Sequence, residues 1–297
     1  MFGFGQLIDI LKKSPKKIVF TEGNDPRILE AASRLLASNF LSPILVGNEA
    51  EIQKAAEESG FNIRGAKIID PLHFEKFDEM VTMFCDLRKS KGVTPEQAKG
   101  ILSQANYFGT MLVKMGYADA LLGGATYSTA DTVRPALQLI KTKPGNSIVS
   151  SCFILVRPSA TGENEVLAMA DCAINIHPTE DELVEIAGEA AECAKIFGVD
   201  PKVAFLSYST LGSGKGEDVD KMRNAAQKNC ILHFRSMESF SLMQPYLQEL
   251  HVPNVRNPKW QDMQIHLFSR ISMQEILDIR LRSVLVTLMH MVRFFLD

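Results

Sequence analysis

Short apolar runs alternate with amphipathic stretches over the first 70 residues, and this alternation constrains the fold more than any other feature. Apolar runs of strand length occupy residues 18–20, 43–47 and 66–70. Helical patterns lie between them, one beginning at Pro26 and one over residues 49–59. Because such alternation is typical of parallel α/β units, the sequence predicts an α/β domain built on a parallel sheet.

A second stretch repeats this pattern and gathers polar residues at the end of its predicted strand. Residues 118–122 form an apolar run that predicts a short buried strand. A pair of glycines follows and favours a tight turn. Ser128 is then placed to cap a helix over residues 130–141, with Asp131 as the capping-box acid.

A strand, a glycine turn and a new helix N-terminus together predict a cradle of free N–H groups, here called the Gly-Gly cradle, residues 123–129. A cradle of this kind is suited to an oxyanion. Arg134 lies in the second helical turn, and its side chain leans back toward the helix N-terminus, so a two-pronged grip on phosphate is feasible. The alternative interpretation is an ordinary strand–helix turn with a surface arginine.

A polar turn at residues 143–146 predicts the boundary between two domains. The first is expected over residues 1–145 and the second over residues 146–297, both of the α/β class. The elements expected after the boundary are strands at residues 147–156, 165–171 and 203–207, and a helix over residues 180–197 capped by Thr179.

The last of these strands leads into a loop rich in Ser, Thr and Gly. It is not a P-loop, because Ser209 stands where the first glycine of that motif belongs and Gly216 where its hydroxyl belongs. Its glycines are also spaced wrongly for a dinucleotide-binding turn. Two interpretations remain: a mobile surface loop, or a ligand-contacting loop tipped by Lys215.

Two further arginines each have a structural and a functional interpretation. Arg27 sits beside the start of a helix that Asp25 can cap, with Pro26 at its first position. It is either a surface residue that complements nothing in particular or part of a site. Arg88 is expected near the C-terminal end of a helix over residues 77–91, where a cation complements the helix dipole.

Composition excludes several classes of function. The net charge is −3 with charges mixed throughout, so no basic stripe indicates a nucleic-acid partner. No apolar run approaches the roughly 20 residues of a membrane helix, and no signal-peptide pattern is present. The five cysteines form no CxxC pair and no metal-type spacing, which predicts buried thiols, no bound metal and a cytoplasmic location.

Six strings in this chain resemble the phosphate acetyltransferase (phosphotransacetylase) and phosphate butyryltransferase family, and they occur in family order across residues 16–228. They are TEGNDPRILEAA, PILVG, LRKSKGVTPEQA, GGATYSTADTVRPALQ, LAMADCAINIHP and AFLSYSTLGSGKG. The resemblance implies two αβα domains with mainly parallel sheets and an active-site cleft between them, usually in a homodimer. It also implies reversible transfer of acetyl between coenzyme A and phosphate, with coenzyme A as substrate, no permanently bound cofactor and no metal.

The resemblance further implies which residues bind acetyl-CoA, phosphate and acetyl phosphate. Arg88 and Arg134 match arginines that the family uses near its substrate. Ser128 and Thr129 match the acyl-phosphate side of the site. The residues expected to face the same cleft from the second domain are Ser207, Ser209, Thr210, Gly212 and Ser213. A neutral donor set of this kind can polarise a carbonyl as charge builds on its oxygen.

One departure from the family pattern leaves the catalytic base unassigned. The family carries an Asp-Leu-Ser-Arg-Gly motif near its C-terminus and, shortly after it, the aspartate proposed as the thiol base; this chain has no such string. Three alternatives therefore stay open beside an acetyltransferase: transfer of a longer acyl group such as butyryl, a non-catalytic protein that keeps the ligand cleft, and an interaction domain like those fused to some malic enzymes.

The composition of the last residues changes abruptly. Residues 231–297 contain no Gly and no Ala, although the whole chain has 19 glycines. Average usage would place about five glycines there. Four of the six histidines and the single tryptophan, Trp260, fall in this stretch. We therefore predict that residues 229–297 are an out-of-frame reading of an ordinary family C-terminus; the alternative is a diverged tail with its own helices.

The genetic code supports the frame hypothesis. Reading from the third base of each codon, residues 260–264 permit Ala-Gly, one free position, then Ala-Asn, which is a family pattern at this distance. Residues 273–282 permit Ala-Gly-Asn-Ile-Gly-Tyr-Lys, and residues 237–245 permit Gly-Glu-Leu-Gln followed by Asp-Ala-Ala. Three such matches in family order favour a single-base shift near codon 229.

Overall fold

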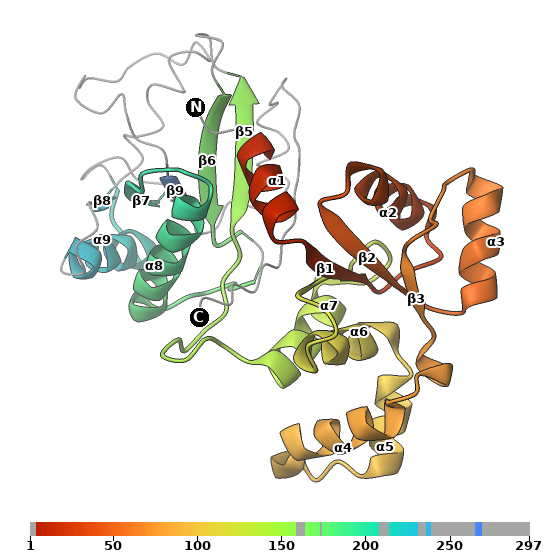
Figure 1. Ribbon diagram of the computed structural model, residues 1–297. Helices are drawn as coiled ribbons and strands as arrows, with labels where there is room; N and C mark the ends of the chain where they lie inside the picture. Colours follow the sequence, from red (N-terminus) through yellow and green to blue (C-terminus); the bar gives the residue numbers. More distant parts are fainter. Residues whose placement is uncertain are drawn as a thin grey trace. The chain divides into compact units, whose positions relative to one another are not determined.

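A computed structural model describes residues 4–158, 164–172, 174–207, 214–230, 236–238 and 265–268 (Figure 1). The chain divides into two compact units, one from Phe4 to Lys143 and one that begins at Pro144. The first unit opens with the amphipathic helix α1 (Phe4–Lys13). The assignment of residues 1–145 and 146–297 as functional domains stays a prediction.

The first unit contains a four-stranded sheet in which all strands run parallel, which confirms the α/β class expected from the alternating pattern. The strand order is β3-β2-β1-β4. The strands are β1 (Lys16–Phe20), β2 (Leu41–Val46), β3 (Lys67–Ile69) and β4 (Ala120–Leu122). The outer strand β4 therefore pairs with β1, about 100 residues earlier in the chain, with Phe20 opposite Leu122.

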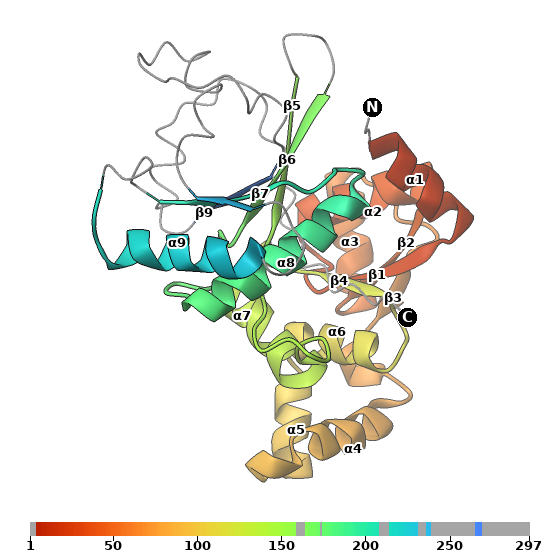
Figure 2. The same ribbon diagram turned by 90° about the vertical axis from the view of Figure 1, so that its left-hand side faces the viewer.

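Helices cover both faces of this sheet (Figures 1 and 2). Phe20 and Leu45 pack on one face against α2 (Pro26–Ser38) and α3 (Glu49–Ser59). Their strand neighbours Val19 and Ile44 point to the other face, because successive side chains alternate in a strand. That face is covered by α6 (Ala105–Lys114), and α4 (Phe77–Leu87) and α5 (Pro95–Leu102) extend the same hydrophobic cluster beyond it.

The helix expected over residues 77–91 is shorter in the structure. It ends at Leu87, and Lys89–Lys91 form a 3₁₀ turn instead. Gly92 follows with φ +64°, a left-handed conformation that glycine adopts at little cost and that ends a helix. Thr94 then starts α5 with a full capping box to Gln97.

The helix expected over residues 130–141 is divided in two. An α-helix, α7 (Thr129–Pro135), is followed by a wider π-helical turn over Ala136–Ile140. Pro135 has no N–H with which to bond the carbonyl of Asp131, one turn earlier. The side-chain amide of Asn106 on α6 donates to this carbonyl instead, at 2.8 Å. A residue outside the helix thus satisfies the group that proline leaves open.

The second unit contains a five-stranded sheet in the order β5-β6-β9-β7-β8. The strands are β5 (Phe153–Pro158), β6 (Asn164–Ala170), β7 (Val203–Leu206), β8 (Ser236–Glu238) and β9 (Ile265–Phe268). β5 and β6 are antiparallel, and the remaining pairs are parallel. The sheet is therefore mainly parallel, as expected.

Two helices pack on this second sheet, α8 (Glu180–Ile196) and α9 (Glu217–Cys230). Thr179 caps α8, as the sequence predicts, and it also forms a capping box with Glu182. The buried face of α8 is rich in alanine, which lets the helix approach β6 closely. A second helical layer on this sheet stays a prediction. In the described parts of both units, no helix combines the length and apolar character needed to cross a membrane.

Candidate active site

The carboxyl ends of β1 and β4 lie side by side, because the two strands are parallel neighbours. Ligands of open α/β sheets bind at this edge. Thr21 and Glu22 follow β1, and the Gly-Gly cradle, residues 123–129, follows β4. The strand pairing therefore brings two of the sequence motifs, TEGNDPR and GGATYS, to one place.

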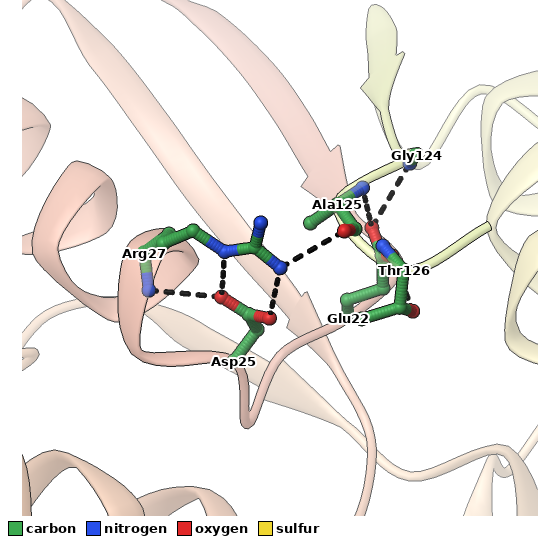
Figure 3. Close-up of polar contacts among 6 residues, drawn as sticks. All are labelled: Glu22, Asp25, Arg27, Gly124, Ala125 and Thr126. Atoms are coloured by element: carbon green, nitrogen blue, oxygen red, sulfur yellow. Dashed lines mark hydrogen bonds and ion pairs between the residues drawn. The ribbon is translucent and has the colours of Figure 1, made fainter.

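Glu22 occupies the cradle with its own carboxylate (Figure 3). Its side chain accepts hydrogen bonds from the N–H groups of Gly124 and Ala125, both at 3.0 Å, and from the N–H of Thr126. The Thr126 hydroxyl donates a fourth bond at 2.7 Å. The expectation that these N–H groups are free for a substrate oxyanion is therefore wrong for residues 124–126, because an internal anion already binds them.

Arg27 holds the same loop from its other side (Figure 3). Its Nη2 donates to the Ala125 carbonyl at 2.9 Å. Its Nε and Nη2 also form a two-pronged pair with Asp25, at 2.9 and 2.7 Å. The interpretation of Arg27 as a surface residue that complements nothing is therefore wrong. The backbone of Ala125 is therefore bonded on both sides: its N–H donates to Glu22, and its carbonyl accepts from Arg27.

Asp25 both caps α2 and orients the guanidinium. Its Oδ1 accepts from the Arg27 N–H at 2.9 Å, which is the N-cap bond that the sequence predicts. The hydrogen bond from the Arg27 side chain holds the pKa of Asp25 below its usual value. The carboxylate in turn raises the pKa of Arg27.

Asp25→Asn is expected to destabilise the protein at neutral pH and to lose that effect in acid. Asparagine keeps the cap, so the variant loses only the charged pair with a largely exposed arginine, and the decrease in the free energy of unfolding should be modest. Because the pKa of Asp25 is lowered in the folded state, its contribution is present above the ordinary value of 3.8 and disappears as pH falls below it. Urea unfolding at pH 7, 5 and 3 measures this difference.

The control for this experiment is Glu30→Gln, which removes the other acid–arginine pair of α2. That pair, with Arg34, joins two exposed side chains. We expect it to change the free energy of unfolding by less than about 0.5 kcal/mol at every pH. A constant deficit of Asp25→Asn from pH 7 to pH 3 would contradict the assignment of its effect to the carboxylate charge.

Close packing beneath the loop requires glycine at two positions. A Cβ at Gly123 would lie 2.6 Å from Thr21 Oγ1, and one at Gly109 on α6 would lie 2.7 Å from Thr21 Cγ2. Thr21 is 2% exposed, and its hydroxyl has no hydrogen-bond partner among the described residues. Gly124 has φ +105°, which an L side chain rarely adopts. Gly123 and Gly124 therefore set the path of the chain toward α7.

Ser128, Thr129 and Arg134 lie together on the first two turns of α7. Ser128 caps the helix through the Asp131 N–H at 3.2 Å, and its hydroxyl donates to the Asp131 carboxylate at 2.6 Å. The Asp131 carboxylate thus bonds the Ser128 side chain instead of completing the capping box that the sequence predicts. Arg134 Nη1 lies 3.9 Å from Asp131 Oδ1, beyond hydrogen-bond range, and the arginine side chain is 60% exposed. Its guanidinium therefore faces solvent and is accessible to an anion.

The other predicted site residues lie on separate elements. Arg88 is the C-cap of α4 in the first unit and is half-buried. Ser207 directly follows β7 in the second unit. Ser209, Thr210, Gly212 and Ser213 lie outside the described residues. That these groups share one cleft with the cradle stays a prediction.

Two carboxylates that hold loops at strand ends were not predicted from the sequence. Glu22 is one; the other is Asp171, directly after β6. Asp171 accepts hydrogen bonds from Ser151 and from the backbone N–H groups of Ile174 and Asn175, the last at 2.7 Å. The signal for both was an acidic residue at the end of a predicted strand, or two residues after one, within a family string.

Cys172 is expected to be nearly inert toward alkylation in the folded protein. Burial, and then the neighbouring Asp171 charge, raise the pKa of this thiol to about 12, against an ordinary value of 9.0. The thiolate is the reacting form, so reaction with iodoacetamide at pH 8 should be about a thousandfold slower than for an ordinary thiol. Peptide mass spectrometry measures the alkylation rate of Cys172, with the urea-unfolded protein as control. Equal rates in the folded and unfolded protein would contradict this prediction.

The described residues contain no group of three or more His, Cys, Asp or Glu side chains that could hold a metal ion. The functional groups identified in the two units are arginine guanidinium groups, hydroxyls and two loop-holding carboxylates. Such groups are suited to binding and orienting an anionic substrate.

Comparison with known proteins gives consistent matches. A family model described as phosphate acetyl/butaryl transferase matches residues 4–230. A phosphate acetyltransferase of Thermoanaerobacterium thermosaccharolyticum is 49% identical over 229 residues, which are 76% of this chain and 69% of that protein. One from Bacillus subtilis is 50% identical over 211 residues, 71% of this chain and 64% of that protein. The chain thus spans about two thirds of the length of these relatives.

Solved structures agree with the sequence comparison. A phosphotransacetylase from Streptococcus pyogenes superposes with a TM-score of 0.77 at 43% identity, over 89% of this chain and 80% of that one. A branched-chain phosphotransacylase from Enterococcus faecalis shares the fold, with a TM-score of 0.51 at 19% identity, over 85% and 78% of the two chains. With its six strings in family order and a family match over residues 4–230, the chain belongs to the phosphate acetyl/butaryl transferase family.

Proposed function

We propose that this protein is a phosphate acetyltransferase, which transfers acetyl reversibly between coenzyme A and phosphate. The observation that carries the proposal is the 49–50% identity, over most of residues 4–230, with two proteins of that name. Against transfer of a longer or branched acyl group stands the much lower identity, 19%, with the branched-chain phosphotransacylase. Coenzyme A is then a substrate, and no permanent cofactor is needed.

The geometry of the first unit supports separate roles for its amide, guanidinium and hydroxyl groups in this reaction. Acyl transfer needs the acyl phosphate held rigidly and its charge balanced. The cradle amides of residues 124–126 bind Glu22. Guanidinium groups are therefore expected to balance the charge of the phosphate. Arg134, which is exposed and only weakly paired, is suited to that role, and Arg88 is proposed beside it. The hydroxyls of Ser128 and Thr129 are proposed on the acyl-phosphate side.

Kinetics of the frame-corrected chain with acetyl-, propionyl- and butyryl-CoA, each with phosphate, test the acyl group. The expected result is the highest kcat/KM with acetyl-CoA. A preference for butyryl-CoA would overturn the acetyltransferase assignment in favour of a butyryltransferase. The reverse reaction, from acetyl phosphate and coenzyme A, is measured as a matched check, because a reversible transferase must give both.

Location and assembly form a second, coarser part of the proposal. The four described cysteines, Cys85, Cys152, Cys172 and Cys193, are all free thiols. Unpaired thiols are typical of a reducing compartment, which supports a cytoplasmic enzyme. The homodimer implied by the family resemblance is also proposed, and light scattering coupled to size-exclusion chromatography tests it. Its partners are then small molecules and a second copy of this chain.

A further inference from the structure

Glu22 is a buried carboxylate whose hydrogen bonds come from backbone N–H groups and a hydroxyl. The residue is 6% exposed. Its Oε2 accepts from two successive N–H groups, of Gly124 and Ala125, and its Oε1 accepts from the N–H and the hydroxyl of Thr126. Successive N–H groups that converge in this way form an anion-binding nest. A buried carboxylate is tolerated when its lone pairs are satisfied, and here four bonds satisfy them.

The loop that Glu22 holds leads directly to the proposed anion-binding residues. Thr126 is two residues before Ser128, the cap of α7, and Arg134 projects from the next turn. Arg27 fixes the carbonyl of the central residue, Ala125, so the loop is bonded on both sides. Burial, and then the Glu22 charge, raise the pKa of the Tyr127 hydroxyl in the same loop. The conformation of the segment before α7 thus depends on a side chain more than 100 residues away in sequence.

We propose that Glu22 is a positioning residue that acts as a built-in anion. Its carboxylate fills the amide nest of residues 124–126, fixes the start of α7, and keeps substrate phosphate out of the nest. Phosphate is thereby directed to the guanidinium groups. The first two statements concern the fold of this loop alone; the last one rests on the proposed function.

Two substitutions separate the charge of Glu22 from its volume. Glu22→Gln keeps the size, but its NH₂ group faces one or two of the N–H donors and cannot accept from them. Glu22→Ala removes the carboxylate together with one methylene, and the missing piece has the size of acetate. If the nest is an anion site, added acetate should occupy it in the alanine variant. Sodium chloride at equal ionic strength serves as the comparison, because it cannot reproduce a two-oxygen acceptor.

Amide hydrogen exchange of the purified full chain at residues 124–126 measures the effect directly. We expect exchange there to be roughly ten- to hundredfold faster in Glu22→Gln than in the wild type, with the core strands β1 and β2 unchanged. In Glu22→Ala, acetate should restore protection in a concentration-dependent manner, and inorganic phosphate should do so as well. In the wild type, neither anion should change exchange at these three residues.

The matched control is Asp119→Asn, a carboxylate that bridges the same two strands at their opposite ends. Asp119 accepts from the Lys17 N–H at 2.8 Å, just before β4. The Asp119→Asn substitution should leave amide exchange at residues 124–126 unchanged. An equal increase in Asp119→Asn would show that any weakening of the β1–β4 pair opens the loop, and would overturn a specific role for Glu22. Wild-type exchange in Glu22→Gln would overturn it too, as would acetate failing to protect Glu22→Ala.

These readouts do not depend on catalysis. If the frame-corrected chain transfers no acetyl group while the exchange results hold, the proposed function fails and the role of Glu22 in the loop stands. If transfer occurs but Glu22→Gln exchanges like the wild type, the positioning role fails alone. Where activity is measurable, Glu22→Gln should raise KM for phosphate by about tenfold or more, with a smaller change in KM for coenzyme A.

Discussion

Correcting the reading frame near codon 229 by one base is expected to convert a chain with little or no transacetylase activity into an active enzyme. The expected gain is at least 10²–10⁴ in rate, because that is what an acid–base group typically contributes. The family resemblance places the thiol base beyond an Asp-Leu-Ser-Arg-Gly motif, and residues 229–297 contain no such string. The family match itself ends at residue 230.

Sequencing the coding DNA around codons 225–235 and assaying both chains side by side decide the matter. The corrected chain should contain the three family strings that the codons permit, and the motif beyond them. The corrected chain carrying Arg134→Ala serves as an internal check that any recovered activity belongs to the proposed site. Two results contradict the prediction: a one-base correction that restores no family string, or an uncorrected chain as active as full-length relatives.

Arg134→Ala is expected to raise the apparent constant for phosphate or acetyl phosphate about ten- to hundredfold in an active, frame-corrected chain. A charge-assisted hydrogen bond to phosphate is worth roughly 1.5–3 kcal/mol, and each 1.4 kcal/mol is a factor of about ten. The guanidinium is 60% exposed and lies 3.9 Å from Asp131, so its loss should cost little stability. Steady-state kinetics with the thermal midpoint measured in parallel separate binding from folding.

Two further variants sharpen this test. Arg134→Lys should recover only part of the loss, because an ammonium group cannot reproduce the planar two-pronged fork. Arg34→Ala removes an exposed arginine on α2 that pairs with Glu30, and it should leave the constant unchanged. A constant for Arg134→Ala equal to that of Arg34→Ala would remove Arg134 from the site.

Local features of the sequence predicted much of the first unit. The helix start at Pro26, the cap at Ser128 and the helix over residues 49–59 all appear where the pattern places them. These signals are readable because a cap bonds N–H groups two or three residues away in the same chain segment. The parallel sheet was also predictable, since alternating strands and helices leave few other ways to bury both.

The helix ends were less predictable because they depend on compensation from outside the helix. The division of the helix at Pro135 involves the Asn106 amide, which lies 25 residues before the Asp131 carbonyl that it bonds. α4 ends at Leu87, and a 3₁₀ turn over Lys89–Lys91 follows it. Periodicity alone continues through both points, so it extends each helix too far.

The sequence by itself determined the strand–turn–helix pattern around the Gly-Gly cradle, its cap at Ser128 and its relation to a transferase family. Only the tertiary structure decided what fills the cradle. The parallel pairing of β1 with β4 places Glu22 beside N–H groups 102–104 residues away in sequence. No local pattern records that distance, because a backbone N–H donates to any anion within reach, and only the folded sheet brings this one there.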